Sequence, residues 1–191
     1  MKMRLRSQRG QGILEFAIVL PFVLVIVLGV VEISYALLDQ HIVTKLTREG
    51  SNLISRNTTL TAAGEVMRTM STRPVDFSSS SHIIFSVVKK GATTGTANVD
   101  KDILYQRYEF GPLAAVSTLQ TLGSGSFTGP DYTALNSDTD TRLQVTNLPT
   151  GLVASGGMIY ITEIFSTHTL ITPLDRFGIT VPPVLYSIAY F

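Results

Sequence analysis

Cysteine is absent from the 191 residues of this chain. Its absence excludes a lipoprotein anchor, a disulfide framework and cysteine-ligated zinc. A basic stripe that could follow a nucleic-acid backbone is also missing. Four of the 15 basic residues lie in the first nine positions, and 11 basic and 14 acidic side chains remain beyond residue 10, a balance of −3. We therefore expect no nucleic-acid partner.

Charge is missing from a long stretch near the N-terminus. Residues 16–31, between Glu15 and Glu32, are apolar apart from one proline and one glycine. The 19 residues of 13–31 cover about 30 Å at about 1.5 Å per residue, which matches the hydrocarbon core of a bilayer. The sequence therefore predicts a transmembrane segment over 13–31.

A cleaved secretory signal is the alternative interpretation of this run. Residues 34–36, Ser-Tyr-Ala, loosely resemble a small-x-small cleavage site. The run is longer than the roughly 7–15 apolar residues of such signals, however, and it contains Glu15. Because lysine and arginine crowd its N-terminal side, we expect a cytoplasmic N-terminus and residues after about 36 outside.

The carboxylate of Glu15 is the most informative feature of the apolar run. At a helix centre in lipid such a charge costs about 2.5–3.5 kcal/mol, and a plain anchor has no use for it. Cleavage after Gly10 would make Gln11 the first residue and its α-amine a cation near Glu15. In a staggered bundle, Glu15 of one subunit would pair with the amine of its neighbour. The alternative is an incidental acid at the membrane edge. The basic residues that precede the cleavage position are Lys2, Arg4, Arg6 and Arg9.

The helical pattern continues beyond the apolar run and becomes amphipathic there. No proline interrupts the chain between Pro21 and Pro74. We therefore predict one spine helix over 11–56, hydrophobic in its first half and amphipathic in its second. Its predicted apolar stripe consists of Ile33, Ala36, Leu37, Gln40, Val43, Leu46, Thr47, Gly50, Leu53 and Ile54.

Residues 57–191 are expected to form an α+β head. A short helix is predicted over 61–71, and a second one over 113–122. Runs rich in β-branched and aromatic residues predict a small antiparallel sheet that packs on the amphipathic half of the spine. The predicted strands are 82–89, 103–110, 142–148, 158–166 and 184–191.

The N-terminal residues resemble a known family. Residues 10–21, Gly-Gln-Gly-Ile-Leu-Glu-Phe-Ala-Ile-Val-Leu-Pro, are similar to the N-terminus of TadE-like pseudopilins of the tight-adherence (Tad) subclass of type IV pili. The likeness continues through residues 28–32 and 48–51, with a weaker echo at 171–174. The head is matched only in outline.

This resemblance implies a pseudopilin or minor pilin that takes part in adhesion or secretion. A prepilin peptidase would remove the basic leader, residues 1–10, and Glu15 would serve maturation or assembly. The implied partners are other pilins and pseudopilins, the peptidase, the pilus-assembly platform and the lipid bilayer. The precursor would lie in a bacterial inner membrane with a periplasmic head, and the mature subunit in the pilus.

Two further residues of the spine are candidates for assembly. Phe16 follows Glu15 directly, and Gly29 gives close backbone approach in an otherwise bulky apolar run. Such glycines favour contact with another helix, although Gly29 can also be a neutral glycine of a membrane helix. The main alternative function is a static, membrane-anchored binding protein of the outer face that never polymerises.

Signals for catalysis or metal binding are incomplete. Asn136, Asp138 and Asp140 share the first three ligand positions of an EF-hand loop, but Thr141 replaces the turn glycine and Asn147 the closing glutamate. We therefore assign them to a solvated acidic loop and expect no metal and no cofactor. The serines include no Gly-x-Ser-x-Gly motif, and enzyme activity is not expected.

Cleavage after Gly10 is directly testable. Protein from the native membrane or filament should have an intact mass that lacks residues 1–10, because the peptidase is expected to recognise the basic leader and Gly10. An uncut N-terminus in cells that contain the peptidase would contradict this prediction, as would a start near Leu37.

Overall fold

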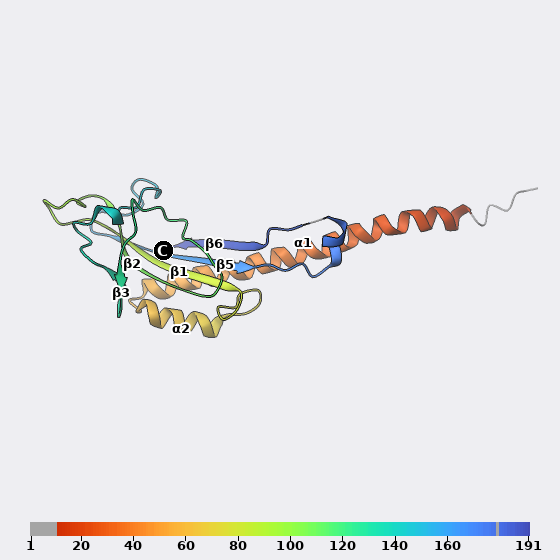
Figure 1. The fold of residues 1–191 in the computed structure, drawn as a ribbon, viewed down its shortest axis with the longest axis horizontal. Helices are drawn as coiled ribbons and strands as arrows, with labels where there is room; N and C mark the ends of the chain where they lie inside the picture. Colours follow the sequence, from red (N-terminus) through yellow and green to blue (C-terminus); the bar gives the residue numbers. More distant parts are fainter. Residues whose placement is uncertain (1–10, 179) are drawn as a thin grey trace, which may run out of the picture. The chain divides into compact units, whose positions relative to one another are not determined.

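The computed structural model describes residues 11–178 and 180–191, which form two compact units. The first unit comprises the described residues up to Leu38 together with residues 169–182. The second unit comprises residues 39–168 and 183–191. Helix α1 (Gln11–Ser55) is continuous over 45 residues and contributes to both units (Figure 1).

The second unit contains one antiparallel sheet. Its strand order is β3-β4-β2-β1-β5-β6, so the long central strand β1 lies between β2 and β5. Helix α2 (Leu60–Met70) follows α1 directly. The strands are β1 (Ser81–Lys90), β2 (Asp102–Phe110), β3 (Phe127–Thr128), β4 (Thr133–Ala134), β5 (Met158–Thr167) and β6 (Val184–Tyr190), and the 3₁₀ helix η2 (Thr141–Leu143) precedes β5. The 3₁₀ helix η3 (Pro173–Phe177) belongs to the first unit.

The C-terminal half of α1 is the core helix of this unit. Its buried residues recur every three or four positions, which places them on one face of the helix. They join one hydrophobic cluster with alternate residues of β1, including Ile83, Phe85 and Val87. Gly50 allows the closest approach, because a Cβ there would lie 2.8 Å from Cγ2 of Thr162. The buried residues of this helix face are Val43, Leu46, Thr47, Gly50, Ser51 and Ile54.

The opposite face of the sheet is covered by irregular chain. Val88, Leu104 and Ile161 form a second cluster with Leu119 and Val153, which lie in segments without helix or long strand. Both faces of the central strands are therefore buried, which explains why β1 is apolar along most of its length.

The structure confirms the predicted fold class, a long N-terminal apolar helix followed by a head with an antiparallel sheet. The expected start of the buried stripe was wrong. Ile33 is 60% exposed and Leu37 is 67% exposed, whereas Val43 is fully buried. The side chains that pack on the sheet begin further along the helix than the sequence pattern suggested.

Two predicted elements of the head were also wrong. Residues 142–148 form no strand: they begin in η2, which the Asp140 side chain caps by accepting from the Arg142 N–H, and continue through isolated bridges. Residues 113–122 form no helix, because their backbone N–H groups donate elsewhere. The Thr118 N–H donates to Glu163, and the Gln120 N–H donates to Asn147.

Gly29 and Gly50 of α1 should respond differently to substitution. Gly50→Leu should destabilise the protein by about 1–3 kcal/mol, because the added side chain collides with Thr162 and Phe85. Gly29→Leu should leave the melting temperature unchanged, because a Cβ there meets nothing within 4 Å. Thermal unfolding of the full chain in detergent, followed by circular dichroism, measures both variants. Equal melting temperatures would contradict this packing.

Candidate functional site

The N-terminal half of α1 presents apolar side chains to its surroundings. In the described residues, α1 is the one helix long and apolar enough to cross a membrane, and its most apolar window is almost entirely exposed. Phe16, for example, is 64% exposed. An apolar surface of this extent requires lipid or other helices around it. The large exposed residues of this segment include Ile13, Leu14, Phe16, Ile18, Phe22, Leu24, Ile26 and Val30.

The predicted cleavage and assembly residues are spread along this half of α1. Gly10 lies outside the described residues, and Gln11 is the first residue of the helix. Glu15 is exposed about one turn after Gln11. On an ideal helix, Gly29 lies about 21 Å from Glu15 along the helix axis and about 40° from it around that axis. The two residues therefore share a side of the helix but form no single cluster.

Glu32 is a second carboxylate of the spine, and it is buried within the first unit. It is 2% exposed, and the segment that follows β5 surrounds its carboxylate with donors. The N–H of Thr172 donates at 2.9 Å and its Oγ1 at 2.7 Å, while the N–H of Ile171 donates at 3.2 Å to each oxygen. Hydrogen bonds to a charged group are about twice as strong as neutral ones.

This arrangement attaches residues 169–178 to α1 immediately after the predicted transmembrane segment. Thr172 is the N-cap of η3, so the same residue starts the 3₁₀ helix and binds the carboxylate. Leu174, in the first turn of η3, is 1% exposed. A buried carboxylate is tolerated only with such hydrogen bonds, so the contact specifies both the helix position and the loop conformation.

Sequence reasoning missed this role of Glu32, although two signals for it were present. Glu32 is the first charged residue after the apolar run, and residues 171–174 read Ile-Thr-Pro-Leu. Threonine directly before proline is typical of a helix start, where backbone N–H groups are available to an acceptor. The pairing of these two distant signals could not be derived from their spacing.

A second buried carboxylate, Glu163 of β5, organises the face of the sheet opposite α1. It accepts hydrogen bonds from Ser117 Oγ, from Thr118 N–H (2.8 Å) and Oγ1 (2.6 Å), and from Tyr186 OH (3.1 Å). Arg107 of β2 donates to Ser117 at 2.9 Å. The Ser117 hydroxyl is thus engaged on both sides, and the network holds the irregular segment 111–122 against the sheet.

Burial shifts the pKa values of two side chains near Glu163. Burial raises the pKa of the Tyr186 phenol, and the nearby Glu163 charge adds to this effect. Burial lowers the pKa of the Arg107 guanidinium, against the opposing effect of Glu163. The phenol therefore stays protonated and donates to the carboxylate at neutral pH, which suits an anchor for the loop.

The acidic loop places its carboxylates beside basic side chains. Asp138 accepts from Thr93 (2.9 Å) and Lys89 (3.4 Å), and both contacts lower the pKa of its carboxyl. Asp140 pairs with Arg142 at 2.8 Å, which lowers its pKa. Asn136 has a left-handed backbone with φ 54° and accepts turn hydrogen bonds through its carbonyl. Among the described residues, no group of three acidic or histidine side chains is arranged to hold a metal.

The chain therefore belongs to the class of proteins in which a long, exposed apolar N-terminal helix is followed by an α+β head. Residues 10–52 match the family model described as TadE-like protein, which confirms the resemblance predicted from the sequence. The TadE-like segment makes the chain a candidate component of a Tad pilus. Comparisons with curated proteins and with solved structures gave no significant match.

Removal of the Glu32 carboxylate should release the segment that binds it. Glu32→Ala leaves the N–H groups of Ile171 and Thr172 without their acceptor, at a cost of about 1–3 kcal/mol for each buried donor. Trypsin should then cut after Arg176 about tenfold faster or more, because cleavage follows the population of the open segment.

The control for this proteolysis is Glu65→Gln, which alters an exposed carboxylate in α2. It should leave the rate of cleavage after Arg176 unchanged in the same detergent. Equal rates for Glu32→Ala and the unmodified chain would show that Glu32 does not hold the segment.

Proposed function

We propose that this protein is a pseudopilin or minor pilin that assembles through its N-terminal helix into a Tad-type pilus, in adhesion or secretion. The observation that supports this most strongly is the exposed apolar surface over residues 13–31, which carries a carboxylate one turn from the predicted mature N-terminus. The TadE-like match covers the same part of the chain.

In this proposal the precursor has three parts. Residues 1–10 form a basic leader, residues 11–56 form the spine, and residues 57–191 form the head. The precursor spans the inner membrane once, with a cytoplasmic N-terminus and a periplasmic head. A prepilin peptidase cuts between Gly10 and Gln11, and the assembly platform then transfers the mature subunit from the bilayer into the filament.

Electrostatic pairing drives the first step of this transfer. Glu15 of one subunit binds the α-amine of Gln11 in its neighbour, so that two charges leave the low-dielectric region as a neutral pair. Phe16 and the other exposed apolar side chains then exchange lipid contacts for contacts with neighbouring spines. The pair of Glu15 and the α-amine sets the axial register between neighbouring spines, and the apolar contacts provide most of the buried interface area.

Gly29 is the proposed point of closest approach between spines. A Cβ at this position meets nothing within 4 Å in the isolated chain, so no contact inside the chain requires a glycine there. A neighbouring helix backbone can therefore approach at this point, as small residues permit in membrane helix pairs.

Glu15→Ala should leave membrane insertion intact and abolish or strongly reduce incorporation into pili. The neighbour's amine would lose its partner, which costs about 3–5 kcal/mol when the remaining charge is buried. Pilus number per cell and the mature subunit's level in sheared filaments measure the effect, with total membrane abundance as the reference.

Two further variants sharpen this test. Glu65→Ala removes an exposed head carboxylate and should assemble normally. Gly29→Leu should be cut by the peptidase normally but incorporated less well. Normal incorporation of Glu15→Ala would favour the static membrane-anchored alternative, in which the charge has no role.

A further inference from the structure

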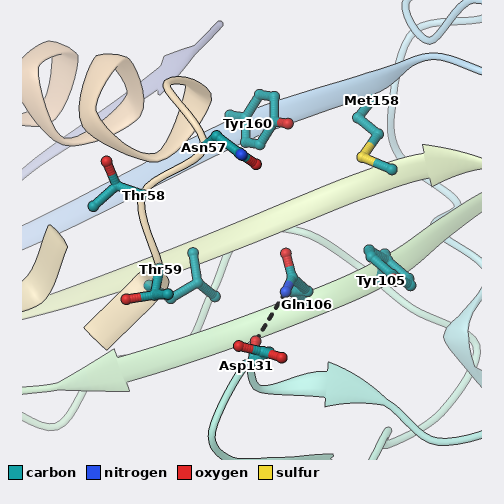
Figure 2. A pocket seen from close by; sticks show the side chains of 9 residues that line it. Asn57, Thr58, Thr59, Tyr105, Gln106, Asp131, Met158 and Tyr160 are labelled. Atoms are coloured by element: carbon teal, nitrogen blue, oxygen red, sulfur yellow. Dashed lines mark hydrogen bonds between the residues drawn. The ribbon is translucent and has the colours of Figure 1, made fainter. Parts of the chain in front are cut away.

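A hollow of about 260 Å³ lies on the helix-facing side of the sheet, within the second unit. Its lining strand residues lie on β2 and β5, with β1 between these two strands, and the linker between α1 and α2 passes over it (Figure 2). This volume is slightly below the range of about 300–1,000 Å³ that is typical of small-molecule sites. Its lining residues are Asn57, Thr58, Thr59, Leu60, Tyr105, Gln106, Asp131, Met158 and Tyr160.

The end of α1 explains why the sheet is open at this position. The helix ends at Ser55, and Asn57 adopts a left-handed backbone with φ 63° that redirects the chain. Thr59 then caps α2 by accepting from the Ala62 N–H. The strands continue beyond the point where α1 covers them, and the linker bridges the gap.

Two tyrosines provide the aromatic surface of the hollow. Tyr105 is the extra residue of a β-bulge, because Val87 pairs with Gln106 while Val88 pairs with Leu104. Bulges redirect side chains and are frequent beside functional sites. The Lys89 ammonium lies 4.3 Å from the centre of the Tyr105 ring and holds that ring in place. Tyr160 lies on β5 in the same view.

Most polar side chains that line the hollow make no hydrogen bond within the described part of the chain. Within the described part of the chain, the side chains of Asn57, Thr58 and Asp131 and the hydroxyls of Tyr105 and Tyr160 make no hydrogen bond. The exceptions are the Gln106 amide, which donates to the Asp131 backbone carbonyl at 2.9 Å, and the Thr59 hydroxyl, which caps α2. The hollow therefore combines ring faces with available donors and acceptors.

The charges of the hollow disfavour an anionic ligand. Its lining contains one carboxylate, that of Asp131, and no lysine, arginine or histidine. The nearby Lys89 ammonium is already bound to Asp138 at 3.4 Å and to Ser137 at 3.1 Å. Phosphates, nucleotides and acidic sugars would face an uncompensated negative charge.

We propose that this hollow binds a neutral carbohydrate of one to three rings. The apolar C–H face of a sugar ring packs on the tyrosine rings, and the hydroxyls at its edge bind Asn57 and Asp131. The carboxylate suits a neutral polyol, because it accepts two hydroxyl hydrogen bonds without requiring a cation. This site is independent of the proposed assembly through the spine.

Binding can be measured with the full chain in lipid nanodiscs, which avoid glycoside detergents. The probes are cellotriose, maltotriose and chitotriose, with trigalacturonate as an anionic probe, and saturation-transfer NMR and titration calorimetry detect binding. At least one neutral trisaccharide should bind saturably. Its affinity should fall about tenfold or more in Tyr160→Ala and in Asp131→Ala, because each variant removes a direct contact.

Tyr190→Ala is the matched control, because Tyr190 is an exposed tyrosine of β6 outside the hollow. It should bind the trisaccharide as the unmodified chain does. Asp131 is exposed, so Asp131→Ala decides the question if Tyr160→Ala folds poorly. Binding of none of the neutral probes, equal binding of trigalacturonate, or unchanged binding by Asp131→Ala would each overturn the proposal. None of these outcomes bears on pilus assembly, which the pilus counts test separately.

Discussion

The structure depends on one helix, α1, whose first half exposes apolar side chains and whose second half packs against the sheet. From Ile13 to Val31 the side chains of α1 are apolar apart from Glu15 and mostly exposed, whereas from Val43 to Ile54 one face is buried against the sheet. Because the helix is continuous from Gln11 to Ser55, no flexible linker interrupts it between the apolar half and the core half. The backbone hydrogen bonds are satisfied inside the helix in both halves, which is the condition for crossing lipid.

In this cysteine-free chain, two buried carboxylates hold irregular segments of the chain in place. Glu32 and Glu163 each receive backbone N–H and hydroxyl donors from a segment without long regular structure, residues 169–178 and 111–122 respectively. The donors in these contacts are backbone N–H and hydroxyl groups, which give directional hydrogen bonds that specify the loop conformation.

Much of the fold could be predicted, because local patterns determine it. Helical periodicity identified α1 and α2, and alternation of β-branched residues identified the long strands. The errors at residues 113–122 and 142–148 have different causes. In 113–122, backbone N–H groups donate to the distant side chains of Glu163 and Asn147, whereas residues 142–148 begin in η2, which the neighbouring Asp140 caps. The partner of Glu32 was unpredictable because it too is distant in the sequence. The hollow also depends on a bulge at Tyr105, which no periodicity reveals.

The family match covers the spine helix and not the head. It covers residues 10–52, and thus ends before the linker, the sheet and the hollow. The matched part contains Glu15 and Gly29, which are proposed to contact neighbouring helices, and Glu32, which binds residues 171–172. Substitutions in the hollow leave those contacts intact, since the hollow and the apolar half of α1 belong to different compact units. The carbohydrate binding proposed for the hollow can therefore change without altering the surface by which the spine is proposed to assemble.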